Sequence, residues 1–175
     1  MALLRADRIR IPVERRAVVA RAAGAYRYVS QTENNWCWAA CGEMLMQAHG
    51  INETQCSLAS QKFKLACCPS PGAPHGCDKV AWPDQVYPPR LPTFPVDGQI
   101  TETRLIQELA AGKPVQVCYR WKGSSSTHVA LVIAQLAQGR YGVLDPDKKV
   151  AQATYRFQDL ATAHGEGDWI MTFTF

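Results

Sequence analysis

The residue best suited to chemistry in this sequence is Cys37, in the stretch QTENNWCWAA over 31–40. Cysteine attacks as a thiolate, which is stabilised by a cationic neighbour or by the N-terminus of a helix. Apolar residues then recur with helical spacing, which predicts a helix over 36–49 with Asn34 or Asn35 as its cap. Cys37 would lie in its first turn, where unpaired backbone N–H groups favour an anion. Taken alone, it is equally well explained as a core residue or half of a disulfide.

A histidine and an aspartate in the second half of the chain offer the partners that such a cysteine needs. His128 begins an apolar run over 128–135, and a returning run over 140–144 ends at Asp145. With a hairpin loop of three or four residues, the two side chains fall opposite each other within about one residue of register, where cross-strand side chains lie only ~5 Å apart. The carboxylate would hold one imidazole nitrogen and leave the other to deprotonate the thiol. Without this pairing, His128 is read as structural and Asp145 as an Asp-Pro turn residue.

Gln31 precedes Cys37 by six residues on a polar loop. Its amide can join the backbone N–H of Cys37 in stabilising a tetrahedral oxyanion, a contribution of roughly 3 kcal/mol for one such donor. The alternative is a solvated loop glutamine, and only the spacing favours the catalytic interpretation.

The elements that must position these residues divide the chain into two halves. Between residues 69 and 95 lie eight of the eleven prolines, so this segment is expected to be a long loop or a bridge. Helical spacing recurs before and just after it, whereas β-branched and aromatic runs follow. The sequence therefore predicts an α+β fold with a helical N-terminal lobe and an antiparallel β C-terminal lobe. The expected elements are helices over 57–65, 101–111 and 157–163, and strands over 115–121, 128–135, 140–144 and 169–175.

Composition restricts the class of protein. A chain of 175 residues with 47% hydrophobic and 19% charged residues suits one soluble globular domain. The net charge of +4 is mild and the basic residues are scattered outside 5–27, so no nucleic-acid partner is inferred. No apolar run approaches the ~18 residues that cross a bilayer. Residues 1–30 are interpreted as a basic extension or leader without the apolar core of a secretory signal peptide, and residues 31–175 as the domain.

Four of the seven cysteines, Cys56, Cys67, Cys68 and Cys77, fall within 22 residues around a loop rich in proline and glycine. Such a loop buries few apolar side chains, so the cysteines indicate stapling by disulfides in an oxidising environment outside the producing cell. Because no signal peptide is visible, we expect a specialised export route or a processed precursor. A zinc site that also uses His75 is the alternative, although the Cys-x-x-Cys pairs of structural zinc sites are absent.

Together these residues resemble the papain-like cysteine peptidases: a Gln, five intervening residues, then Cys-Trp-Ala at the start of a helix, with a His and a carboxylate following in a β-rich half. The His-to-Asp spacing and the Leu-Asp-Pro sequence look most like two compact bacterial branches, the peptidase domains that mature bacteriocin leaders and the effector proteases of plant pathogens. The resemblance covers about 31–175. It implies a protein or peptide substrate, no cofactor, and four roles: Gln31 as oxyanion donor, Cys37 as nucleophile, His128 as general base and then acid, and Asp145 as orienting carboxylate.

The resemblance also bears on the other cysteines. Cys41 is a rival nucleophile, but it lies one turn further into the helix, so we expect it, like Cys118, in the core. With Cys37 free, the four loop cysteines form two disulfides in one of three connectivities. Trp169 is a candidate shield for the imidazole–carboxylate contact. Plant-type papains usually carry Asn where Asp145 stands, so the bacterial branches, and a secreted effector or toxin, are favoured.

Two other functions stay open at this point. A papain-like transferase would pass the acyl group to an amine or thiol through the same intermediate. A non-catalytic binding domain on this fold would usually have lost one of the catalytic side chains, and all four are present here.

Overall fold

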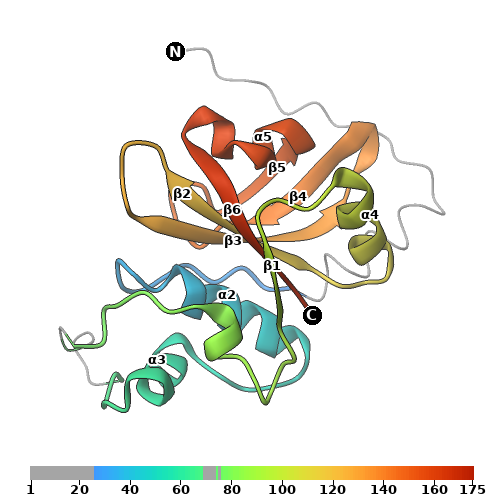
Figure 1. Cartoon of the computed structure of the whole chain (residues 1–175). Helices are drawn as coiled ribbons and strands as arrows, with labels where there is room; N and C mark the ends of the chain where they lie inside the picture. Colours follow the sequence, from blue (N-terminus) through green and yellow to red (C-terminus); the bar gives the residue numbers. More distant parts are fainter. Residues whose placement is uncertain (1–25, 69–73, 75) are drawn as a thin grey trace.

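The structure is a computed structural model that describes residues 26–68, 74 and 76–175 (Figure 1). The helices and strands predicted from the sequence are present in the predicted order, and two further strands, Phe94–Asp97 and Gln152–Arg156, are added to them. The helices are α2 (Cys37–Ala48), α3 (Gln55–Phe63), α4 (Glu102–Ala110) and α5 (Phe157–Ala161), and the strands are β1 (Phe94–Asp97), β2 (Val115–Trp121), β3 (Thr127–Gln135), β4 (Arg140–Leu144), β5 (Gln152–Arg156) and β6 (Gly167–Thr174). Three short 3-10 turns complete the described elements: η1 (Pro83–Gln85), η2 (Ala137–Gly139) and η3 (Ala163–Gly165).

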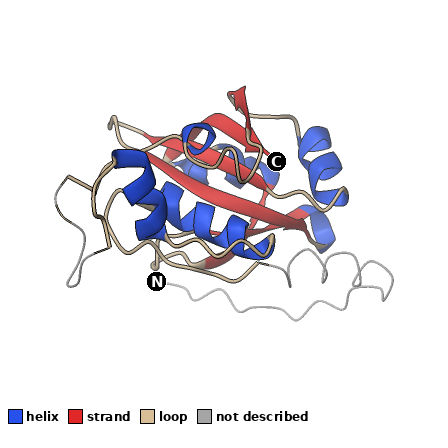
Figure 2. Cartoon of the chain, turned by 90° about the horizontal axis from the view of Figure 1, so that it is seen from below, coloured by secondary structure: helices blue, strands red, loops and turns tan. Residues whose placement is uncertain are grey.

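The strands form one antiparallel sheet in the order β1-β6-β2-β3-β4-β5. Side chains alternate between its two faces, so Val129 and Leu131 pack with α2 in one core, whereas Ala130 and Val132 pack with α4 and α5 in a second core. Helices α2 and α3 lie below the sheet in Figure 1, and Figure 2 shows them from that side, in front of the strands. The predicted two-lobe α+β fold is confirmed.

Two strands were not predicted, and each has a physical reason. Strand β1 contains Pro95, and all four of its residues are exposed at the edge of the sheet, which is where proline is tolerated in a strand. Strand β5 forms the opposite edge and pairs only with β4, so its apolar content is low. Strand β1 depends on a partner distant in sequence, β6, and β5 alternates between exposed and partly buried residues, so neither strand forms an apolar run.

Part of the expected N-terminal extension packs on the helical lobe. Tyr26, Tyr28 and Val29 pack against the core around α2, and the Ser30 carbonyl accepts a hydrogen bond of 2.9 Å from Gln55 Nε2. Residues 1–25 lie outside the described residues, so the boundary at residue 30 stays a prediction. None of the described helices is long and apolar enough to cross a membrane.

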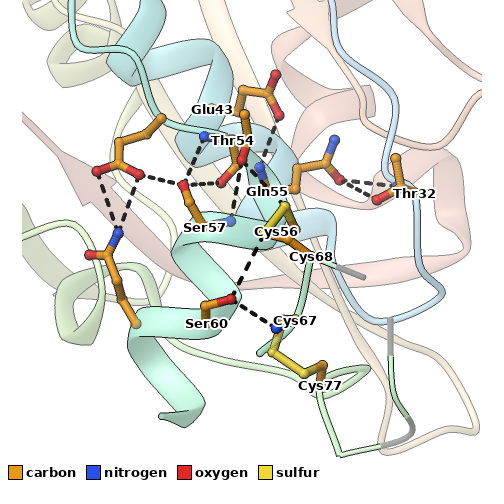
Figure 3. The surroundings of a disulfide bond; sticks show 12 residues. Thr32, Glu43, Thr54, Gln55, Cys56, Ser57, Ser60, Cys67, Cys68 and Cys77 are labelled. Atoms are coloured by element: carbon orange, nitrogen blue, oxygen red, sulfur yellow. Dashed lines mark hydrogen bonds between the residues drawn. A yellow bond between two sulfur atoms is a disulfide. The ribbon is translucent and has the colours of Figure 1, made fainter. Parts of the chain in front are cut away.

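The four loop cysteines form two disulfides, Cys56–Cys68 and Cys67–Cys77 (Figure 3). This selects one of the three connectivities and excludes these thiols as zinc ligands. His75, the fifth member of the alternative zinc site, lies outside the described residues, and no group of metal-binding side chains occurs within the described ones.

Gln55, the first residue of α3, ties the helical lobe to the loop before α2 (Figure 3). It is 4% exposed, and its side-chain oxygen accepts from the Thr32 N–H at 3.0 Å. Its own backbone N–H donates to the Glu43 carboxylate on α2 at 3.0 Å. The polar loop that carries Gln31 is therefore anchored to both helices of this lobe.

Candidate active site

Cys37 is the first residue of α2, and two tryptophans on either side of it hold this end of the helix in place. Trp36 and Trp38 are buried, and their indole N–H groups donate to the carbonyls of Cys77 at 2.7 Å and Lys79 at 3.0 Å. The chain that leaves the Cys67–Cys77 disulfide thus forms the support for the start of α2. This explains why a loop with few apolar residues has to be stapled.

The prediction that Asn34 or Asn35 caps this helix is wrong. Trp36 occupies the N-cap position, and its side chain makes no capping hydrogen bond. Asn35 instead engages Asp78, donating its backbone N–H to Oδ1 at 2.7 Å and its amide to the carbonyl at 3.2 Å. Without a side-chain cap, the first N–H groups of the helix are left to stabilise negative charge at Cys37.

His128, at the start of β3, and Asp145, directly after β4, lie in contact at one end of these neighbouring strands. His128 Nε2 and Asp145 Oδ1 are 2.7 Å apart, and each residue is only 9% exposed. The same carboxylate oxygen accepts the Asp147 N–H at 2.8 Å, and the Asp145 N–H donates to the Ala151 carbonyl at 2.7 Å. Asp145 is therefore held by the turn and by the imidazole at once. It is both the partner of His128 and a residue of an Asp-Pro turn, the two interpretations that the sequence offered.

The register predicted for this pair is wrong in its detail. Leu131 of β3 pairs with Leu144 of β4, so Asp145 falls beside Ala130 and two residues away from His128. The contact is a diagonal one across the strands, within reach of longer side chains. An offset of two residues keeps both side chains on the same face of the sheet, whereas an offset of one would separate them.

A register shift between Val132 and Ala134 of β3 produces this offset. On the hairpin side of the shift, Ala134 pairs with Gly142. Continued unchanged, that register would place Asp145 beside Leu131, on the face that packs against α2. The single extra residue in β3 therefore turns Asp145 to the face of His128, as a β-bulge does next to many functional sites.

The imidazole of His128 interacts with both candidate partners, since Cys37 as well as Asp145 raises its pKa. Burial lowers the pKa of His128, but the interactions with Asp145 and Cys37 outweigh it and raise the pKa from 6.5 to about 10. The imidazole is accordingly protonated at neutral pH. The structure thus brings together a thiol, an imidazolium and a carboxylate from α2, β3 and the end of β4.

The aromatic ring that covers the imidazole is Trp121, not Trp169 as expected. The rings of Trp121 and His128 stack with centroids 5.7 Å apart and planes at 24°. Trp169 lies in the second core and donates its indole N–H to Thr172 Oγ1 at 3.0 Å. Tyr119 pairs with His128 across β2 and β3, so the two side chains lie on the same face of the sheet. Trp121, two residues further along β2, shares that face, and this spacing was the signal for its place beside the imidazole.

Gln31 lies near the Asp145 turn, but its amide does not point to an oxyanion position. Its backbone N–H donates to the Pro146 carbonyl at 2.9 Å. Both hydrogens of its side-chain amide are used within the loop, since Nε2 donates to the carbonyls of Glu33 at 3.0 Å and Asn34 at 2.8 Å. Donation to an oxyanion would need a rotation that breaks one of these bonds. The backbone N–H of Cys37 is the donor that needs no rearrangement.

The two remaining free thiols are buried, as expected for core residues. Cys41 is fully buried, its Sγ donates to the Val129 carbonyl oxygen at 3.7 Å, and burial raises its pKa well above 9. Burial likewise raises the pKa of Cys118 to about 12, with Cys37 raising it further and Arg120 lowering it. Neither thiol has the helix N-terminus or the imidazolium that Cys37 has.

A cavity of about 290 Å³ opens beside Cys37. One wall consists of Cys118 and Arg120 of β2 with Thr127 and Val129 of β3, and residues 80–82 with Trp38 form the other. It lies between the two lobes, and Cys37 is part of its lining. An extended chain passing Cys37 can place one side chain in it.

The sequence matches no protein-family model, and no curated protein matches it. Solved structures do. The peptidase domain of Streptococcus ComA, a bifunctional ABC transporter involved in quorum sensing, superposes with a TM-score of 0.57 at 17% identity, covering 85% of this chain and 97% of that domain. A putative C39-like peptidase from Bacillus anthracis gives a TM-score of 0.56 at 15% identity, covering 86% and 94%. Nearly the whole length of each peptidase structure is matched, and the chain therefore has the papain-like fold of these C39-like peptidase domains.

Proposed function

We propose that this protein is a cysteine peptidase in which Cys37 is the nucleophile, His128 the general base and acid, and Asp145 the residue that orients the imidazole. The observation that carries the proposal is the buried 2.7 Å contact between His128 and Asp145, together with the interaction of the same imidazole with Cys37 at the start of α2. The fold of the peptidase domains supports it, because that fold presents these residues between two lobes.

In the proposed reaction, the protonated imidazole and the uncapped start of α2 favour the thiolate of Cys37. The sulfur attacks the peptide carbonyl, and the oxyanion accepts from the backbone N–H of Cys37, joined by Gln31 once its amide rotates. His128 gives its proton to the leaving amine as the C–N bond breaks, which leaves a thioester on Cys37. The neutral imidazole then takes a proton from water, and the resulting hydroxide cleaves the thioester and restores the thiolate–imidazolium pair.

We further propose that the protein works in an oxidising compartment, outside the cytosol of a bacterial producer, on a protein or peptide substrate. The two disulfides support this location, because they staple the segment that supports the start of α2. The cavity beside Cys37 supports a peptide substrate, because it has room for a side chain next to the reacting sulfur.

Active-site labelling tests the proposal. The protein, with its disulfides intact, is treated with an epoxysuccinyl inhibitor and its intact mass is measured; Cys37→Ala is the test variant and Cys41→Ala the matched control, since both remove a thiol from α2. We expect a single adduct on the wild type and on the control variant, and none on Cys37→Ala. Turnover of an unfolded protein substrate should fall at least ~10²-fold in His128→Ala. A folded wild type that is not labelled at Cys37, or a Cys37→Ala variant that retains turnover, would refute the proposal.

A further inference from the structure

Arg120 is the one charged residue among the described residues that line the cavity beside Cys37. It lies on β2 two residues after Cys118, and in the β2–β3 pairing Cys118 faces Val129 while Arg120 faces Thr127. Alternate residues of a strand share a face, so these four side chains form one continuous patch. All four line the cavity. Arg120 thus belongs to the sheet wall of the cavity, at a point where its side chain is exposed to solvent.

No ion pair neutralises this arginine within the described part of the chain. The three ion pairs found there involve Arg90, Arg104 and His128. Asp168 sits directly across from Arg120 in the pairing of β2 with β6, yet the two side chains form no ion pair. Its charge acts on the cavity lining, since it lowers the pKa of the neighbouring Cys118 thiol against the larger effect of burial.

The rest of the cavity wall gives this charge a specific use. Trp38, Trp82 and Val129 supply apolar surface. Ser125 and Thr127, whose side chains carry hydroxyl groups, line the same cavity as the arginine. A guanidinium offers a planar fork of N–H donors that matches a carboxylate in a bidentate manner. A basic substrate side chain in the same cavity would be repelled by the positive charge of Arg120. The wall therefore favours substrates with a carboxylate and disfavours those with a Lys or Arg side chain.

We propose that Arg120 is a specificity-determining residue that makes this enzyme select substrates with a carboxylate in the residue that occupies the cavity beside Cys37. The inference rests on the proposed peptidase function. Two sources supply the same chemistry: an Asp or Glu side chain within a polypeptide, or the C-terminal carboxylate of a peptide whose last residues fill the cavity.

The test uses a chymotryptic peptide library, whose peptides keep internal Lys, Arg, Asp and Glu, digested by the wild type, Arg120→Gln and Arg120→Glu, with the cleavage sites determined by mass spectrometry. Lys122→Gln is the matched control, because it removes the same charge from the same hairpin but does not line the cavity. We expect cleavage sites of the wild type to be enriched for a carboxylate at one fixed position. A matched pair of quenched peptides with Glu or Gln at that position should then differ in kcat/KM by about fivefold or more, the scale of a partly exposed charge-assisted contact.

Arg120→Gln should abolish this preference, Arg120→Glu should shift it to Lys or Arg, and Lys122→Gln should retain it. Internal cleavage beside Asp or Glu identifies the side-chain source; cleavage that amidation of the peptide C-terminus prevents identifies the terminal carboxylate. Cys37-dependent cleavage without a carboxylate preference, or a preference unchanged in Arg120→Gln, overturns this inference and leaves the peptidase proposal intact. If the wild type neither cleaves the library nor labels at Cys37, both proposals fall.

Discussion

Replacement of His128 by glutamine should remove a pH-dependent part of the free energy of unfolding. The pKa of His128 is raised from 6.5 to about 10, because Asp145 and Cys37 outweigh the burial that lowers it. A group that holds its proton more tightly in the folded state stabilises the protein in full below its unfolded pKa. That contribution is lost as the pH rises through the folded pKa. The relevant window therefore runs from about pH 6.5 to about pH 10.

The size of the effect follows from this rise. At about 1.4 kcal/mol per pH unit, a rise from 6.5 to about 10 corresponds to roughly 5 kcal/mol. His128 is only 9% exposed, so solvent screening takes little from this figure. The introduced amide of His128→Gln keeps a donor for Asp145 but does not titrate. Comparing the two proteins therefore isolates the charge of the imidazole from the hydrogen bond it makes.

The assay is urea unfolding of the wild type and His128→Gln at a series of pH values from 6 to 10, with the disulfides intact. Tyrosines also titrate at alkaline pH, such as the partly buried Tyr26, whose pKa burial raises to about 12, but they act equally in both proteins and cancel in the difference. We expect the stability advantage of the wild type to shrink by several kcal/mol across this range. A difference that stays constant with pH would refute the reasoning. Cys37→Ala should narrow the window, because one of the two groups that raise this pKa is then gone.

Two further predictions concern the support of the site. Replacing Cys67 and Cys77 by serine opens a loop with a sequence separation of 10, which should lower the free energy of unfolding by about 3 kcal/mol. It should also lower kcat, because the start of α2 is hydrogen-bonded to this loop. A urea titration and a kcat measurement check both effects, and an unchanged kcat would contradict the proposed support. Trp121→Leu should move the alkaline limb of the pH–rate profile down by about half a pH unit, since a stacked indole stabilises the imidazolium by roughly 0.5–1 kcal/mol. Trp121→Phe is its control, and equal profiles for all three proteins would exclude this role.

Local sequence pattern predicted the secondary structure that depends on neighbours in the chain. The helix expected over 36–49 is Cys37–Ala48, and the strands expected over 115–121 and 140–144 are Val115–Trp121 and Arg140–Leu144. Periodicity succeeds here because these elements bury a continuous face. It failed for the edge strands Phe94–Asp97 and Gln152–Arg156, because they bury no continuous apolar face: the first is exposed throughout and pairs with a strand distant in sequence, and the second alternates between exposed and partly buried residues.

Details of the candidate site depended on contacts that local pattern does not encode. Asn35 has the right type for a helix cap, yet Asp78, distant in sequence, takes its hydrogen bonds. The amide of Gln31 has the right spacing for an oxyanion donor, yet two carbonyls of its own loop accept both of its hydrogens. A polar side chain takes whichever partner the fold brings within reach, and sequence spacing does not name that partner.

The sequence by itself determined the chemical inventory of this protein: a thiol at the start of a helix, a histidine and an aspartate at the ends of adjacent strands, and four cysteines around a proline-rich loop. Tertiary structure alone decided how that inventory is used. One register shift in β3 turns Asp145 to the face of His128, and the pairing of β2 with β3 brings Trp121 over the imidazole and Arg120 into the cavity. The physical reason is the period of two in a strand, because one residue of register reverses the face on which every later side chain lies.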